Sequence, residues 1–482
     1  MKRRLLIFTL IVSFVGTLQP GSGAYGQQGP RTASKPEAAA AKANAPAPLP
    51  QQMQLANRVL ANGLEVIVLE DHSVPLVTIE LAVKNGSYTE PPELNGLSHL
   101  FEHMFFRTNR ADANHEPYLQ QLGESGMPQP NGQTQEELVN YYVTSTTQYY
   151  PAALRYMKDS IRYPLFDEQE FAREKEVVIG ELDRHESNPG FYLNEAMINR
   201  LYYKYPSRKN PGGNRETVSK ATTAIMRMIQ QRYYVPNNTA LVVTGDARPE
   251  DVFRQAQEMF GDWPRAEDPF VKFPMVEHPP LPKSEGAVIK QPVQNVIINL
   301  GWHGPSIGKD DQATYAADVF SYILQQPNSR FQRALVDTGL VTGVSISYYT
   351  QRNVGPIQLI AQTTPEKARA ALKAIYAEIA RFNDKDYYTD EQLESAKAIL
   401  AGEDLYRREK LSEYVHVISF WWASTGLDYF RGYQDNLRRT SRADISRYVT
   451  NYIIGKPHVG LAMMSEEAQK SAALTPEELI GQ

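Results

Sequence analysis

The segment "LSHLFEHMFF" (97–106) carries two histidines and a glutamate among apolar residues. On a helix, residues three and four positions apart share one face, so His99, Glu102 and His103 are expected to point the same way. Two imidazoles at that spacing can both bind one metal ion, and the carboxylate beside them can lie against a water on that ion. The spacing therefore predicts a metal centre with Glu102 as its general base.

A catalytic zinc needs three protein ligands and one open position, so a third ligand is expected elsewhere in the chain. In "FAREKEVVIGELDRHE" (171–186), Phe171, Glu174, Val178 and Glu181 follow the spacing of a helix face that packs inward. Buried carboxylates are costly unless they have partners. We therefore predict Glu181 as the third ligand of one Zn²⁺ per chain. Glu174 is expected to accept a hydrogen bond from a ligand histidine.

Two observations limit the alternatives for this segment. The chain has no cysteine, which excludes a thiol nucleophile and cysteine ligands, so a metal site must use His, Asp or Glu. The other histidines are isolated or, like His185, lie at a predicted helix end, and we interpret them as structural or solvated residues. The remaining alternative is a surface helix whose histidines are incidental.

Composition places the chain among globular proteins of more than one domain. Its 482 residues favour two domains, and 42% apolar with 22% charged residues are typical of a soluble fold. The net charge of −5 argues against a nucleic-acid-binding protein, which usually carries a basic excess.

The N-terminal residues have the pattern of an export signal. A basic start is followed by an apolar run over 5–18, and Ser22 and Ala24 stand where a cleavage site is expected, which predicts a signal peptide over 1–24. An uncleaved anchor is the alternative. Residues 25–52 are rich in Ala, Pro and Gln and are predicted to form a disordered tether. We expect export to a bacterial periplasm or secretion, with no membrane span after cleavage.

The body of the chain is expected to divide at a proline-rich stretch. Residues 263–285 are aperiodic and predict a linker between a domain over 53–262 and a domain over 286–482. In the first domain, 76–87 alternates and predicts a half-buried strand, with Val77, Ile79, Leu81 and Val83 on one face and Thr78, Glu80 and Lys84 on the other. Residues 141–150 are also strand-like.

The two halves end alike, which predicts two similar α+β domains. Residues 217–245 and 440–464 each contain a helical pattern, then tyrosine, proline and a strand. The helix predicted over 310–326 corresponds in place to the opening segment and has no histidine. Only the first half is therefore expected to hold the metal.

The order H-x-x-E-H is the inverzincin order, and the chain resembles the insulinase/pitrilysin zinc peptidases, which include the mitochondrial processing peptidase. The resemblance runs from about residue 55 to 478. It is carried by the block around the motif and by three further segments: "NGQTQEELVNYY" (131–142), "FAREKEVVIGEL" (171–182) and "YYVPNNTALVVTGD" (233–246).

This resemblance implies a fold, a reaction and further roles. Each half would be a mainly antiparallel sheet with helices packed on it, and the two units would form a clam-shell. The metal ligands would be His99, His103 and Glu181, the general base Glu102 and the supporting residue Glu174. Asn131 falls where the family's asparagine contacts substrate, so Asn131 is expected to bind the peptide. The activity implied is a zinc endopeptidase acting on short or unfolded peptides.

The chain departs from the family's pattern at two places. "FRTN" (106–109) stands where the family has "FKGT". In addition, many active members have in the second half an arginine followed seven residues later by a tyrosine, and 329–349 has no such pair, since Arg330 is followed by Asp337 and Arg333 by Leu340.

The missing pair implies a catalytic subunit of the bacterial two-subunit type. A homologous non-catalytic subunit would supply the arginine and tyrosine, and a homodimer is the alternative assembly. The alternative is a non-catalytic structural or regulatory subunit of the same fold. Such a subunit has no need to retain two histidines, the base and both glutamates.

Overall fold

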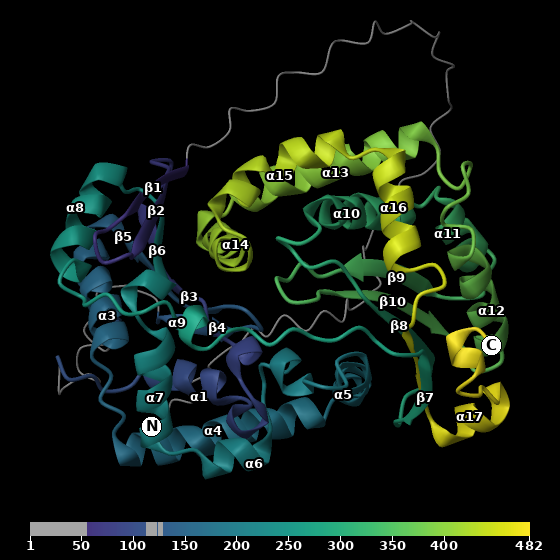
Figure 1. The fold of residues 1–482 in the computed structure, drawn as a ribbon, viewed down its shortest axis with the longest axis horizontal. Helices are drawn as coiled ribbons and strands as arrows, with labels where there is room; N and C mark the ends of the chain where they lie inside the picture. The colour runs from purple at the N-terminus through teal and green to yellow at the C-terminus, as the bar shows by residue number, and fades with distance from the viewer. Residues whose placement is uncertain (1–54, 112–122, 124–128) are drawn as a thin grey trace, which may run out of the picture.

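The computed structural model describes residues 55–111, 123 and 129–482, which form two halves with one β-sheet each (Figure 1). The predicted signal peptide over 1–24 and tether over 25–52 lie outside the described residues. Within the part that is described, no helix combines the length and the apolar character needed to cross a membrane.

The first sheet has six strands in the order β1-β2-β6-β3-β5-β4. Only β2 and β6 are parallel neighbours. The strand predicted over 141–150 ends at Thr146, because Pro151 occupies the first turn of the next helix. The strands are β1 (Leu55–Val59), β2 (Glu65–Glu70), β3 (Leu76–Val83), β4 (Asn131–Thr134), β5 (Val139–Thr146) and β6 (Thr239–Gly245).

The second sheet repeats this arrangement with five strands in the order β7-β11-β8-β10-β9. The outer pair β7 and β11 is parallel and the other pairs are antiparallel, as in β2-β6-β3-β5-β4 of the first sheet. The predicted class, two similar α+β units with mainly antiparallel sheets, is confirmed. The strands are β7 (Glu285–Lys290), β8 (Val296–His303), β9 (Gly343–Tyr348), β10 (Pro356–Thr363) and β11 (Val459–Met464).

Helices of the same half pack on one face of each sheet and enclose its core. In the first half they are α1 (Leu97–Phe105), α3 (Tyr150–Arg162), α4 (Glu168–Glu186), α7 (Thr223–Tyr233) and α8 (Pro249–Phe260). In the second half they include α10 (Asp311–Gln325), α12 (Ala368–Ile379), α13 (Asp390–Arg408), α15 (Leu427–Arg439) and α16 (Arg442–Tyr452). The short helices are α6 (Arg215–Lys220), α9 (Pro269–Lys272), α11 (Arg330–Gln332) and α17 (Glu466–Ala472).

The other face of the first sheet is covered by a helix from the second half, α14 (Leu411–Ser424), which stands between the two halves in Figure 1. Its Ile418 and Trp422 join a core with Ile67 and Val242 of the sheet. The prediction that the strand over 76–87 is half-buried is therefore wrong. Glu80, predicted on its open face, is fully buried because α14 lies over it.

Glu80 keeps its polar partners under this helix. It accepts hydrogen bonds from Asn140 Nδ2 (2.8 Å) and from Nδ1 of His416 on α14 (2.5 Å). Burial lowers the pKa of His416, but the charge of Glu80 and this hydrogen bond outweigh burial and raise the pKa. A satisfied carboxylate–histidine pair thus joins α14 to the first sheet.

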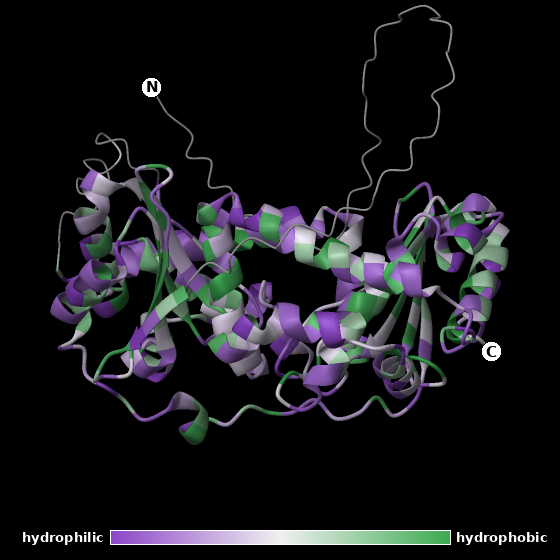
Figure 2. Ribbon diagram, turned by 90° about the horizontal axis from the view of Figure 1, so that it is seen from above, coloured by the Kyte–Doolittle hydropathy of each residue, from purple (hydrophilic) through white to green (hydrophobic). Residues whose placement is uncertain are grey.

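The second sheet is covered reciprocally by α5 (Pro189–Leu201) of the first half. Met197 and Leu201 pack with Val459 and Leu461. In the view of Figure 2 the halves lie side by side, with hydrophobic residues on the strands of both. Each half thus completes the core of the other, and two apolar contacts help to set the relative position of the halves.

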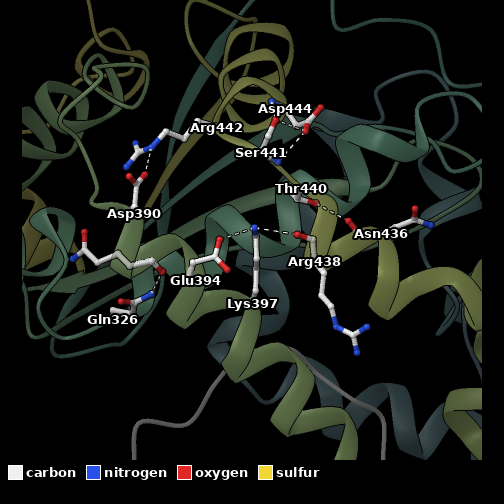
Figure 3. Close-up of polar contacts among 11 residues, drawn as sticks. Gln326, Asp390, Glu394, Lys397, Asn436, Arg438, Thr440, Ser441, Arg442 and Asp444 are labelled. Carbon is white, nitrogen blue, oxygen red and sulfur yellow. Dashed lines mark hydrogen bonds and ion pairs between the residues drawn. The ribbon is translucent and has the colours of Figure 1, made fainter. Parts of the chain in front are cut away.

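Polar contacts fix the helices that present α14 (Figure 3). Lys397 on α13 donates to Glu394 (2.9 Å) and to the carbonyl of Arg438 at the end of α15 (3.1 Å). Arg442 at the start of α16 donates to Asp390 at the start of α13 (2.7 Å). The helices before and after α14 are therefore connected to one another by these polar contacts.

Candidate metal centre and active site

The helix that carries the motif, α1, is anchored at its first turn by a buried carboxylate. The residue that caps this end of the helix, Gly96, has no side chain that could accept a hydrogen bond from the first turn. Instead, Glu90 accepts the backbone N–H groups of Gly96 (2.7 Å) and Ser98 (2.6 Å), which the helix leaves without partners. Gly96 has φ +89°, and a Cβ there would lie 2.6 Å from Cα of Gly213. The start of α1 is thus fixed by the hydrogen bonds to Glu90 and by the close contact between Gly96 and Gly213.

The second element of the site, α4, presents its carboxylates on its buried stripe. The helix begins at Asp167, whose side chain accepts the N–H groups of the first turn. Phe171 and Val178 are buried in the core, and Glu174 and Glu181 are buried on the same side at 5% and 6% exposure. Because α1 and α4 are in contact, this stripe faces the histidines.

The structure brings His99, His103 and Glu181 together. Their ligand atoms lie within 4.8 Å of one another, and all three side chains are buried. Oε2 of Glu181 is 3.6 Å from Nε2 of His99 and 3.5 Å from Nε2 of His103. These separations are long for hydrogen bonds but close to the roughly 3.3 Å expected between two ligands about 2.0–2.1 Å from a tetrahedral zinc.

Glu174 supports His103 from the other side of the ring. Its Oε2 is 3.3 Å from Nδ1 of His103, and its Oε1 forms an ion pair with Nη2 of Arg107 (3.0 Å). A proton held on Nδ1 leaves the Nε2 lone pair directed toward Glu181. Arg107 belongs to the "FRTN" segment, and sequence reasoning did not assign it a role.

Protonation of the cluster follows from burial and the two glutamates. Burial and the neighbouring His103 lower the pKa of His99 to about 3, so His99 is neutral and its Nε2 or Nδ1 can bind a metal. Burial also lowers the pKa of His103, but Glu174 and Glu181 outweigh burial and raise it to about 10. Metal binding must therefore displace a proton from His103.

The donor set fits one zinc ion. Two imidazoles and a carboxylate are a known catalytic zinc set, and no cysteine is required. Nδ1 of His99 is buried and has no hydrogen-bond partner within the described part of the chain. His99, His103 and Glu181 would hold the ion, and Glu174 would orient His103.

Glu102 lies on the same helix but is held by the first sheet rather than by α4. Its Oε2 accepts a hydrogen bond from Oγ1 of Thr134 on the edge strand β4 (2.8 Å). A Cβ on Gly132 of the same strand would lie 2.9 Å from Cγ and 3.0 Å from Oε1 of Glu102. Burial raises the pKa of Glu102 to about 7, against the lowering effect of His103 and Thr134. A carboxylate in this range can accept and return a proton near neutral pH.

We expect Gly132→Ala to impair catalysis without removing the metal. The added methyl group has no room beside Glu102, so the carboxylate must shift, whereas the three atoms nearest to that methyl group belong to Glu102 and Asn140 and to none of the predicted ligands. A displacement of about 1 Å can cost on the order of 100-fold in rate. Steady-state rates and zinc content of the variant check this, and a normal rate would show that Glu102 needs no fixed position.

Asn131, predicted to contact substrate, begins β4 immediately before Gly132. Its Nδ2 donates to the hydroxyl of Tyr142 on β5 (3.2 Å). Because β4 is the edge strand of the first sheet, the side of β4 turned away from β5 has no neighbouring strand in the described sheet. Asn131 is thus placed on the strand that also seats Glu102.

The arginines of the second half that were considered for the missing pair have other surroundings. Nε of Arg330 pairs with Glu378 (3.1 Å), and the Tyr387 hydroxyl donates to the same carboxylate (2.8 Å). Arg333 is exposed and lines a surface cavity with Arg330. Neither arginine is followed at seven residues by a tyrosine, as the sequence already indicated.

The fold and the site together define a metallopeptidase class, and comparison with known families agrees. The profile described as "Insulinase (Peptidase family M16)" matches residues 65–210. The profile described as "Peptidase M16 inactive domain" matches residues 221–400. The chain therefore belongs to the insulinase family, M16.

Individual relatives are distant and carry zinc protease names. The chain is 24% identical over 343 residues to the uncharacterized zinc protease YmxG of Bacillus subtilis, which covers 71% of this chain and 81% of the relative. It is 22% identical over 401 residues to the zinc protease PqqE of Helicobacter pylori, covering 82% and 89%.

Solved structures show the same fold. A protease from Helicobacter pylori superposes with a TM-score of 0.76 at 21% identity, over 85% of this chain and 99% of that one. Pitrilysin superposes with a TM-score of 0.74 at 18% identity, over 87% of this chain and 45% of the larger protein. At these identities the likeness establishes the clam-shell fold.

Proposed function

We propose that this chain is the catalytic subunit of a zinc-dependent endopeptidase. One observation carries the proposal: the ligand atoms of His99, His103 and Glu181 converge within 4.8 Å, with a fourth buried group, Glu102, on the same helix. A zinc-binding protein without activity would need no carboxylate placed to accept a proton. The zinc protease names of relatives in the same family support the metal and the reaction class.

The reaction follows from the positions of the side chains. When bound, zinc acidifies a water and polarises a peptide carbonyl. Glu102 accepts the proton of the water whose oxygen adds to the carbonyl carbon. It then delivers that proton to the amine nitrogen as the C–N bond breaks. Thr134 holds one carboxylate oxygen during both transfers.

The substrate is expected to bind in an extended conformation along β4. The free edge of a short strand can pair with a peptide backbone, which gives main-chain hydrogen bonds with little side-chain preference. Asn131, the first residue of β4, is proposed to contact that peptide. A chamber formed by clam-shell units would admit short or unfolded peptides.

The second half suggests that a partner completes the site. The oxyanion formed during hydrolysis needs a positive or hydrogen-bonding group in addition to the metal. No arginine in 329–349 has a tyrosine seven residues on, so a homologous subunit is proposed to supply that pair, and a homodimer is the alternative assembly.

We expect the purified chain alone to cleave peptides weakly and to gain activity when a homologue with an arginine–tyrosine pair is added. The gain should be about 10²-fold or more, the usual cost of losing one oxyanion-stabilising donor. Titrating the homologue against a fixed amount of this chain measures the effect, and a homologue with its arginine and tyrosine replaced is the control. Full activity of the isolated monomer would reject the partner requirement.

A non-catalytic subunit is the second candidate, since the profile over 221–400 describes an inactive domain and inactive relatives share the fold. That profile matches the half without the histidines. The complete set of His99, Glu102, His103, Glu174 and Glu181 favours the enzyme.

Export through the predicted signal peptide over 1–24 is proposed on the sequence pattern, and secretion of a tagged full-length chain to the periplasm tests it.

A further inference from the structure

The second half carries none of the predicted ligands, yet its β9–β10 connection reaches the strand that seats Glu102. We call residues 349–355 the hairpin tip. The hairpin tip lies against residues 135–138, the turn that joins β4 to β5. Both partners are buried at this contact: Gln351 is 2%, Asn353 6% and Glu137 6% exposed.

Glu137 makes the central contact from the turn. Its Oε2 accepts the backbone N–H of Arg352 (2.9 Å) and its Oε1 accepts the backbone N–H of Asn353 (3.0 Å). The Tyr349 hydroxyl donates to Oε1 of Gln135 (3.2 Å), two residues earlier in the same turn. Charge-assisted hydrogen bonds that both oxygens of one buried carboxylate accept fix a backbone more firmly than hydrogen bonds between neutral groups do.

Lys209 of the first half holds the opposite side of the hairpin tip. Its buried ammonium donates to the carbonyls of Asn353 (2.6 Å) and Val354 (2.9 Å), and to the side chain of Gln351. Tyr202 also donates to the Val354 carbonyl (3.0 Å). The first half thus binds both N–H and C=O groups of the same few residues.

The hairpin tip is itself a fixed part of the second half. Arg352 donates to the carbonyls of Ala423 (2.9 Å) and Ser424 (3.3 Å), which end α14. Ser306 accepts the N–H of Val354, a non-glycine residue with φ +54°. Such a backbone conformation persists only where the surroundings enforce it.

The turn held in this way controls a short strand. β4 has four residues and pairs only with β5 among the described strands, so the turn at 135–138 is its anchor on one side. Thr134, the hydrogen-bond donor to Glu102, is adjacent to that turn. Gly132, two residues before Thr134, packs directly against the side chain of Glu102.

We propose that Glu137 is a positioning residue for the general base, and that the hairpin tip of the second half holds β4 against Glu102 through it. The half without metal ligands would thereby control the proton-accepting group of the other half. This inference rests on the proposed function for its effect on rate. The ordering of β4 by the hairpin tip is a separate, measurable part.

The test compares Glu137→Ala, Glu137→Gln and the unchanged full-length chain, with the partner subunit present if activity requires it. We expect Glu137→Ala to keep one zinc per chain, to show faster amide exchange over 131–135, and to lose at least about tenfold in kcat. Glu137→Gln keeps one acceptor oxygen and should fall between the two. A merely destabilised but correctly folded protein would not lose kcat at saturating substrate well below its unfolding temperature.

Arg431→Ala is the matched control. Arg431 on α15 also joins the halves, through Asn57 (2.8 Å) and the Leu55 carbonyl (3.1 Å), but at β1, the other edge of the sheet. The amide exchange over 131–135 and the kcat of Arg431→Ala should equal those of the unchanged chain. If Glu137→Ala does not fold, Lys209→Met removes the hydrogen bonds that hold the opposite side of the hairpin tip and carries the same expectation.

Unchanged exchange over 131–135 in the Glu137 variants would overturn the proposal, as would faster exchange with an unchanged kcat. An unchanged chain that cleaves no peptide under any condition would overturn the proposed function instead. The exchange measurement would still decide whether the hairpin tip orders β4.

Discussion

Replacing Glu102 by glutamine should leave zinc bound and remove peptide cleavage. Glutamine fills the same volume and can still accept the hydrogen bond of Thr134, so the helix and its neighbours need not move. It cannot accept a proton, and loss of a general acid–base group costs about 10²–10⁴-fold in rate. Rates on a quenched peptide and zinc content by atomic spectroscopy, measured on the same preparation, check the prediction.

The comparison with Gly132→Ala makes this result specific. That variant keeps the carboxylate but displaces it, so its loss should be smaller than that of Glu102→Gln, with zinc retained in both. Full activity of Glu102→Gln would refute the assigned mechanism. Loss of zinc from Glu102→Gln would make Glu102 a ligand rather than the base.

His99→Ala should lose both zinc and activity. His99 supplies one of three protein ligands, its ring is buried, and no other histidine of the described chain is grouped with His103 and Glu181. Two remaining ligands do not make a stable catalytic zinc site. Zinc content should fall from one per chain toward zero at micromolar free zinc, and cleavage should fall to background.

His185→Ala is the matched control, because His185 lies one turn beyond Glu181 on α4 and is not part of the metal-ligand group found among the described residues. It should keep zinc and activity. Stoichiometric zinc in His99→Ala would place the metal elsewhere. Rescue of His99→Ala by excess zinc would support weakened binding rather than misfolding.

The local part of the site could be predicted from the sequence because helical spacing determines it. His99, Glu102 and His103 share a face of one short helix, and Glu174 and Glu181 share the buried stripe of another. Apolar residues on the same helices indicate which face is buried. That the two helices meet was inferred from the need of a catalytic zinc for a third ligand and from the cost of burying a carboxylate.

Residues that act across long sequence separations could not be found in this way. Thr134 and Gly132 lie in a four-residue strand, too short for an alternating pattern, and contact Glu102 some thirty residues earlier. Glu90 and Arg107 flank the motif, but ordinary acidic and basic residues carry no spacing signal. Their roles appear only when the partner atoms are placed.

The sequence also did not indicate that each half covers the sheet of the other half with one helix. The composition of α14 shows that it is buried but not which sheet buries it, so Glu80 was assigned to an exposed face. The similarity of the two halves, in contrast, was indicated by their similar ends. Periodicity predicts elements and their faces, whereas the partner of a face depends on the tertiary fold.

The most direct test of the central claim is the zinc content of the purified full-length chain, measured together with its cleavage of a quenched peptide library, with the partner subunit added. Both should be followed before chelation, after chelation and after zinc is returned. We expect one zinc per chain, cleavage that chelation abolishes, and recovery on adding zinc. A chain that binds no zinc, or one that holds zinc but cleaves nothing with or without the partner, would contradict it.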